Sequence, residues 1–208
     1  MRQIIGNRKK RYRPMLTFEE KDHVYRWDNS VVPSVTQILK PLINFDHIQP
    51  DVLDIARQRG VAVHRMIELD CKGDLDEDGL PDWMRPALVN WRKFVAESGF
   101  QLIESEYRVF HPHYKYAGTL DLFGRMDECS AFIDVKRSFA AGPVIGLQLA
   151  AYHEAYCAQE KVGKAAKRYA LKLSEKGPYR LEPYTDKADF GVFLSLLTIH
   201  QWKGRHKC

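Results

Sequence analysis

Apolar residues recur at helical spacing in several parts of the chain. In residues 51–71 they return every three or four positions, as on one side of an amphipathic helix. A shorter helix is predicted directly after Pro33, where Ser34 is a suitable N-terminal cap. The segments predicted as long helices are Asp51–Cys71, Met84–Ser98, Val144–Gln159 and Lys187–Trp202.

Between these segments the pattern changes to short apolar runs, which are typical of strands. Strands alternating with helices predict an α/β fold, with a mixed central sheet flanked by helices, in a single domain over residues 15–208. The first two predicted strands and the helix after Pro33 form an additional strand–helix segment N-terminal to the central sheet. The predicted strands are Leu16–Glu19, His23–Trp27, Gln101–Phe110, Tyr116–Met126, Ala131–Arg137, Arg168–Ser174 and Tyr179–Glu182.

The composition is that of a folded protein without a membrane span. The 208 residues are 45% hydrophobic and 12% aromatic, which is enough for one well-formed core. No apolar run approaches the roughly 18 residues that cross a bilayer. The basic N-terminus is not followed by the apolar stretch of a secretory signal. We therefore expect a soluble, cytoplasmic protein with no membrane partner.

Positive charge is concentrated at the two ends of the chain. The formal net charge is +5, yet residues 1–14 contain six basic residues and no acidic one, and residues 203–208 contain three more. Without these nine, 23 basic residues stand against 27 acidic ones, a net charge of −4. A basic, flexible tail over residues 1–14 would hold a phosphate backbone without reading its sequence, or it would serve solubility alone.

The four cysteines give no sign of a metal cluster. Cys71, Cys129, Cys157 and Cys208 are far apart in sequence and form no C-x-x-C pair, the spacing that supplies thiolates to zinc and iron–sulfur sites. We expect reduced, structural thiols.

Three charged residues interrupt the apolar strands in the middle of the chain. Asp134 and Lys136 are two positions apart, so a strand places both on one face, and Asp121 lies in the preceding strand. Burying such a carboxylate costs on the order of several kcal/mol unless it is paired or bound to a metal. One interpretation is therefore an ion pair of Lys136 with either acid.

The other interpretation is a metal site, which the surrounding sequence favours. Two carboxylates from neighbouring strands can bind a hard cation such as Mg²⁺, which keeps several waters and also binds phosphate. The cation lowers the pKa of a bound water, and a lysine beside it stabilises the negative charge that develops on the phosphate. These are the components of phosphodiester hydrolysis.

Four motifs occur around these residues in a characteristic order. R-G-x-x-x-H spans Arg59–His64, G-T-L-D ends at Asp121, D-V-K spans Asp134–Lys136 and Q-x-x-x-Y spans Gln148–Tyr152. In this order they resemble the RecB-like branch of the PD-(D/E)xK nuclease superfamily, which includes phage exonucleases. The resemblance covers roughly residues 33–156 and implies a restriction-endonuclease-like core.

The resemblance implies a role for each residue at the two strands. Asp121 and Asp134 match the acids that bind one or two Mg²⁺ or Mn²⁺ ions. The main-chain carbonyl of Val135 would supply a further metal ligand. Lys136 matches the catalytic lysine.

Residues outside these two strands also match the family pattern. His64 matches a helix histidine that reaches the metal. Glu106 matches an acid at the edge of the site, and Glu104 is an alternative because strand alternation would place both on the same face. Gln148 and Tyr152, four positions apart on a helix, would line the site, act in catalysis and hydrogen-bond the DNA backbone or the lysine.

The remaining assignments concern phosphate and cofactors. Arg59 is a candidate ligand for substrate phosphate. Some RecB-like nucleases hold an iron–sulfur cluster with grouped cysteines, which this sequence lacks, so no cluster is expected. A Walker A motif is also missing, so unwinding of a duplex would require a partner protein.

The sequence therefore predicts a Mg²⁺- or Mn²⁺-dependent deoxyribonuclease, more an exonuclease acting on DNA ends in recombination or repair than an endonuclease. A structure- or sequence-selective endonuclease is one alternative. A non-catalytic, nucleic-acid-binding member of the fold is another, against which the four intact residues Asp121, Asp134, Lys136 and Gln148 argue. The expected partners are DNA and a single-strand annealing protein, helicase or other recombination protein, in a bacterium or phage-infected host cell.

Overall fold

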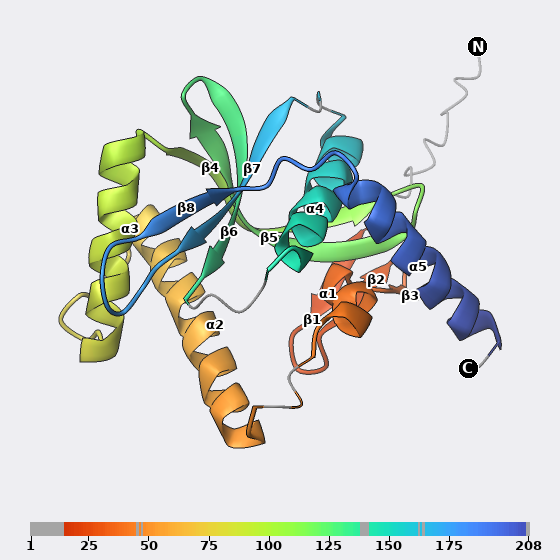
Figure 1. Cartoon of the computed structure of the whole chain (residues 1–208), viewed down its shortest axis with the longest axis horizontal. Coiled ribbons are helices and arrows are strands. Elements are labelled where there is room, and N and C mark those ends of the chain that lie inside the picture. The colour runs from red at the N-terminus through yellow and green to blue at the C-terminus, as the bar shows by residue number, and fades with distance from the viewer. Residues whose placement is uncertain are drawn as a thin grey trace, which may run out of the picture.

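The computed structural model describes residues 15–44, 46, 48–137, 142–161, 163 and 165–206. The predicted basic tail, residues 1–14, lies outside the described residues. A small N-terminal sheet, a larger central sheet and the helices around them make up the described chain (Figure 1). None of its helices is both long enough and apolar enough to cross a membrane.

The small sheet is an antiparallel meander near the N-terminus. Asp28 and Asn29 both have positive φ, as a two-residue turn between twisted strands requires. The sheet packs on the central sheet through Tyr25 and Val32, which share a core cluster with Phe110. Its strands are β1 (Leu16–Glu19), β2 (Val24–Trp27) and β3 (Ser30–Val32).

The central sheet has the order β4-β5-β6-β7-β8 and is mixed. Among these strands only β6 and β7 pair in parallel, and a helix connects them, which is the usual crossover between parallel strands. The predicted α/β fold with a mixed sheet between helices is thus confirmed at this level. The strands are β4 (Gln101–His111), β5 (Tyr116–Met126), β6 (Cys129–Lys136), β7 (Ala166–Lys172) and β8 (Arg180–Pro183).

In the part of the chain that the structure describes, five helices surround the sheets, and sequence signals mark some of their ends. Ser34 caps the first helix in a reciprocal capping box with Gln37. Gly73 ends the second in the left-handed conformation, with φ of 73°. The helices are α1 (Val35–Leu39), α2 (Pro50–Lys72), α3 (Arg85–Ser98), α4 (Val144–Glu160) and α5 (Asp189–His206), with 3₁₀ turns at Lys40–Leu42 and Asp82–Met84.

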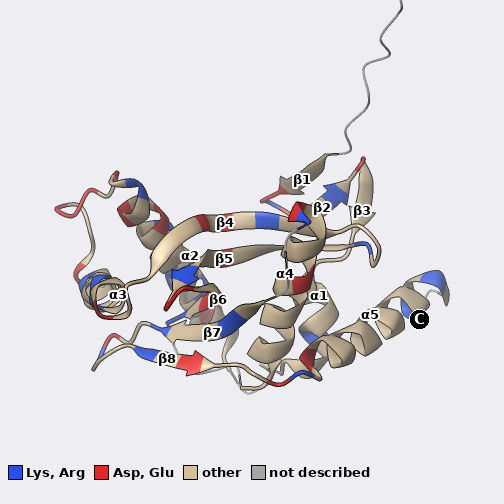
Figure 2. Ribbon diagram, turned by 90° about the horizontal axis from the view of Figure 1, so that it is seen from above, with Lys and Arg blue, Asp and Glu red and all other residues tan. Residues whose placement is uncertain are grey.

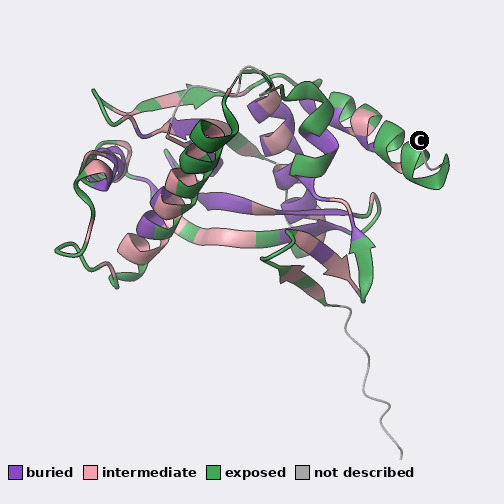
Figure 3. Ribbon diagram, turned by 90° about the horizontal axis from the view of Figure 1, so that it is seen from below, coloured by how far each residue is buried: buried purple, intermediate pink, exposed green. Residues whose placement is uncertain are grey.

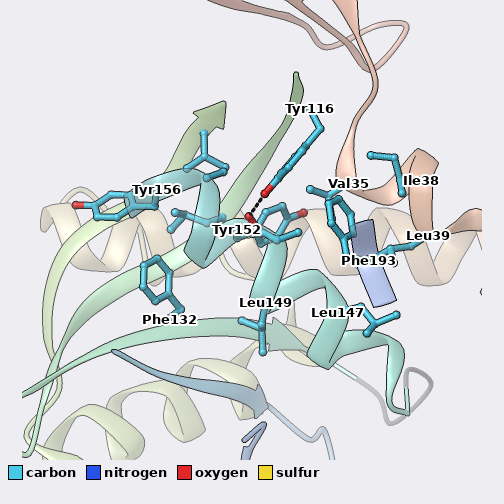
Figure 4. Close-up of a cluster of buried hydrophobic side chains, with 14 of the residues drawn as sticks. Val35, Ile38, Leu39, Tyr116, Phe132, Leu147, Leu149, Tyr152, Tyr156 and Phe193 are labelled. Atoms are coloured by element: carbon cyan, nitrogen blue, oxygen red, sulfur yellow. Dashed lines mark hydrogen bonds between the residues drawn. The ribbon is translucent and has the colours of Figure 1, made fainter. Parts of the chain in front are cut away.

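The helices cover both faces of the central sheet and create two cores. On one face α4 packs with α1 and α5, and Figure 4 shows Tyr152 and Phe193 of this cluster close to Val35. On the other face α2 and α3 enclose Trp91 and Phe94. Burial of this kind is the main stabilising contribution to the fold. The N-terminal half of α2 is largely exposed and so projects beyond the core (Figure 3).

Candidate metal centre

The candidate site lies where β5 and β6 separate. Their antiparallel pairing ends at Leu122 and Ile133. The next residue in each strand is an acid, Asp121 in β5 and Asp134 in β6, and both are buried. Burial raises the pKa of both carboxyls, that of Asp134 to about 6. The fork of the sheet therefore holds two acids at a cost that a nearby cation would offset.

The two acids have different partners in the protein. Lys136 Nζ lies 2.8 Å from Oδ2 and 3.1 Å from Oδ1 of Asp134, so the ion pair that the sequence allowed is present for this acid. Asp121 instead accepts a hydrogen bond of 2.7 Å from the Val135 N–H through Oδ2. Its other oxygen is left to face α2.

His64 of α2 reaches across to this oxygen. Its Nδ1 lies 3.2 Å from Oε1 of Glu106 and 3.6 Å from Oδ1 of Asp121, and its Nε2 lies 3.1 Å from the carbonyl oxygen of Val135. Carboxylate and carbonyl oxygens only accept, so both nitrogens donate and the ring is an imidazolium. Burial alone would lower the pKa of His64, but the carboxylates of Asp121 and Glu106 outweigh it and raise the pKa to about 9.

Backbone geometry distinguishes Glu106 from Glu104. Glu106 has a φ of 49° in the middle of β4, and the β4–β5 register shifts between Leu102 and Glu104. These irregularities disturb the alternation of side chains between the two faces of β4, which would have placed both acids on the same face. Glu106 contacts His64, whereas the charge of Glu104 acts on Tyr107 and Tyr156, where it adds to the rise in pKa that burial causes.

Three side chains converge closely enough to share one cation. One donor atom each of His64, Glu106 and Asp121 lies within 4.8 Å of the others, and the Val135 carbonyl is at hydrogen-bond distance from the same histidine. Oxygen ligands with a single imidazole suit Mg²⁺ or Mn²⁺. A proton must leave His64 before its ring can bind such an ion, so metal affinity should increase with pH. Asp134 is not one of the three converging groups and is paired with Lys136.

Gln148 and Tyr152 lie together on α4, as predicted. Gln148 Nε2 donates a hydrogen bond of 3.2 Å to the Tyr152 hydroxyl. Burial, together with the charges of Asp121 and Asp134, raises the pKa of Tyr152 well above its usual value. The phenol therefore stays protonated and can donate a hydrogen bond.

Arg59 is not among the converging ligands. Its guanidinium stacks 5.0 Å above the ring of Trp83 and lies 3.7 Å from Oε1 of Glu175. Glu175 also pairs with Arg137, the residue that follows Lys136. The assignment of Arg59 to phosphate binding stays a prediction.

A groove of about 1150 Å³ opens beside His64 and Glu106 and extends to the N-terminal sheet. Sequence analysis missed several of its lining residues. Glu68 lines the groove one helical turn after His64, and the spacing of four in H-x-x-x-E was the signal that could have revealed it. Tyr25, which hydrogen-bonds Thr119 at 2.7 Å, gave no such signal because the two residues are 94 positions apart.

The comparisons with known proteins do not identify a family. The chain matches no protein-family model, and no curated protein is significantly similar to it.

Proposed function

We propose that this protein is a Mg²⁺- or Mn²⁺-dependent nuclease that hydrolyses phosphodiester bonds in DNA. The observation that carries the proposal is the convergence at the fork of β5 and β6. Groups from α2, β4, β5 and β6 meet there, although they are spread over residues 64–136. His64, Asp121, Asp134 and Lys136 also lie in the motifs that resemble the RecB-like branch of the PD-(D/E)xK superfamily, and Glu106 matches an acid of that pattern.

The residues of the site would have different roles in hydrolysis. His64, Glu106 and Asp121 would hold a divalent cation. The Val135 carbonyl contacts the other ring nitrogen of His64, so its role as a further metal ligand stays a prediction. When bound, the cation would supply a lowered pKa for its water and neutralise charge on the phosphate. The three side chains fit such an ion in chemistry and in spacing.

Lys136 would act as a fixed positive charge. Burial lowers its pKa, but the carboxylates of Asp134 and Asp121 outweigh that effect and raise it, so the ammonium stays charged. Its side chain is 30% exposed and can therefore reach a substrate oxygen. Asp134 would position this lysine beside the metal ligands.

We propose cleavage from DNA ends. Charged residues of both signs are interspersed over the ribbon, including along β4 (Figure 2), and the chain between its basic ends has a net charge of −4. Such a surface does not favour wrapping a closed duplex. An end, in contrast, needs only to enter the groove beside His64.

The test uses the full chain with end-labelled linear DNA and with a covalently closed circle. Linear DNA should shorten in Mg²⁺ or Mn²⁺, the circle should persist, and EDTA should stop the reaction. Asp121→Asn should reduce the rate by on the order of 10²-fold or more. Asp74→Asn, at an exposed loop acid, is the matched control and should retain the rate.

Two results would contradict parts of this proposal. Rapid opening of the circle under the same conditions would show an endonuclease. Binding of DNA without cleavage in either metal would show the non-catalytic alternative.

A further inference from the structure

The far end of the groove is built by the N-terminal sheet. From His64 and Glu106 the lining continues over Thr119 to Phe18 and His23. These last two residues belong to β1 and to the turn before β2. The small sheet therefore forms a wall of the cavity that contains the candidate metal ligands.

This wall presents an aromatic cluster. The rings of Phe18 and Tyr25 lie 4.5 Å apart with a tilt of 32°, and the ring of His23 meets them edge-on at 5.1 and 5.6 Å. Tyr25 is buried, whereas Phe18 is half-buried and His23 is exposed. Ring surface is thus available to the groove at Phe18 and His23.

Arg108 of β4 adds a positive charge to the same wall. Its guanidinium carbon lies 5.3 Å from the centre of the Phe18 ring, and the residue is exposed. Arg59 and Arg65, the arginines closest in sequence to His64, are each held by a glutamate. Among the residues that the structure describes, no carboxylate lies within ion-pairing distance of Arg108.

The position of Arg108 relates it to the candidate metal centre. It lies two residues beyond Glu106 on β4, which corresponds to about 7 Å along a strand. Both side chains line the groove. A phosphate bound by Arg108 and a phosphate held at the metal ligands could therefore be adjacent phosphates of one nucleic-acid strand.

We propose that Phe18, His23 and Arg108 form a subsite for the nucleotide next to the scissile phosphate, in an unpaired strand. Arg108 binds the phosphate, oriented by its contact with Phe18, and the Phe18–His23 surface stacks the base. Bases within a duplex are covered on both faces by their neighbours, so this surface selects a single-stranded end. The inference rests on the proposed function, because the groove leads to the candidate nuclease site.

Equilibrium binding in EDTA tests the subsite without cleavage. The probe is a fluorescent single-stranded oligonucleotide of about 15 nucleotides, with its abasic counterpart and a blunt duplex for comparison. Arg108→Gln should raise the Kd about 10-fold and reduce the slope of log affinity against log salt by about 0.7. Arg26→Gln removes the same charge from β2 between two residues that face the core, and it should change neither quantity.

His23→Ser separates stacking from charge. It should weaken binding of the normal strand several-fold, leave the salt slope unchanged and have no effect on the abasic strand. Thermal melting checks that each variant is folded. The inference is overturned if Arg108→Gln behaves like Arg26→Gln, or if His23→Ser weakens the abasic strand equally.

The same variants distinguish this inference from the proposed function. If the wild-type chain cleaves DNA in Mg²⁺ while all variants bind and cleave like wild type, the subsite is wrong and the nuclease stands. If the variants lose binding as expected but the wild-type chain never cleaves, the subsite stands and the nuclease is wrong.

Discussion

His64 is held between two acceptors, Glu106 and the Val135 carbonyl, and as an imidazolium it supplies positive charge to the acids at the fork. A divalent cation would supply the same compensation more strongly. The residue therefore has two states that differ by a proton, one for the metal-free protein and one for the metal-bound protein. Its role can be separated from that of an ordinary buried histidine by its effect on metal dependence.

His64→Ala should weaken apparent metal affinity, because it removes one of three converging ligands. We expect the Mn²⁺ or Mg²⁺ concentration for half-maximal cleavage to rise at least about tenfold. High Mn²⁺ should restore part of the activity by mass action. His200→Ala, at an exposed position on α5, is the control. Lower thermal stability with unchanged metal dependence would instead show a purely structural histidine.

Asp134 predicts a pH dependence of metal-free stability. Burial raises the pKa of Asp134 in the folded protein to about 6, above its pKa in the unfolded chain. The folded state therefore loses stability as pH rises through about 6. The loss is complete at neutral pH, which lies above both the unfolded and the folded pKa. Asp134→Asn removes the titration. In EDTA, its unfolding free energy relative to wild type should therefore increase from about pH 4 to about pH 8. Parallel pH profiles in urea unfolding would contradict the assignment.

At the scale of elements, the contact between β5 and α4 sets the position of Tyr152. A Cβ added to Gly118 would lie 2.5 Å from Cε1 of Tyr152, which is far inside van der Waals contact. The glycine of the G-T-L-D motif thus lets α4 approach β5 closely enough to bring Tyr152 within range of the charges of Asp121 and Asp134. Packing against Tyr152 therefore explains why the first residue of this motif is a glycine.

Gly118→Ala should therefore damage the site from a distance. Overpacking of this kind costs roughly 1–3 kcal/mol and would displace the Tyr152 ring. We expect a lower melting temperature together with a reduced kcat, while metal affinity stays close to that of wild type. Gly191→Ala, where an added Cβ meets nothing within 4 Å, should leave activity unchanged. Full activity of Gly118→Ala would show that the position of Tyr152 is unimportant.

Sequence patterns predicted several elements closely. The strands Leu16–Glu19 and Tyr116–Met126 have the predicted bounds, and the predicted helix 51–71 is observed as Pro50–Lys72. The strand Ser30–Val32 was missed because it is three residues long with two exposed side chains. The choice of Glu106 could not be made from alternation, because a positive φ interrupts the alternation at that residue.

At the scale of the whole molecule, the groove arises from segments that are distant in sequence. The N-terminal sheet packs on the ends of β4 and β5 through Tyr25, and the isolated bridge between Ser34 and Ala117 fixes the entry to α1. No local pattern encodes such a contact. Sequence analysis could therefore order the candidate metal ligands along the chain, but it could not show which surface leads to them.

The uneven charge of the chain predicts how it finds its substrate. Residues 1–14 contain six basic residues, while the chain between the two basic ends has a net charge of −4. Each phosphate contact contributes about −0.9 to the slope of log affinity against log salt on duplex DNA. If the tail makes part of its six possible contacts, deletion of residues 1–14 should reduce the magnitude of this slope by roughly two to four.

Turnover at saturating DNA and low salt should stay close to that of the full chain, since no candidate metal ligand precedes His64. Unchanged affinity and slope after the deletion would show that the folded body alone, through residues such as Arg108 in the groove, supplies the attraction to phosphate.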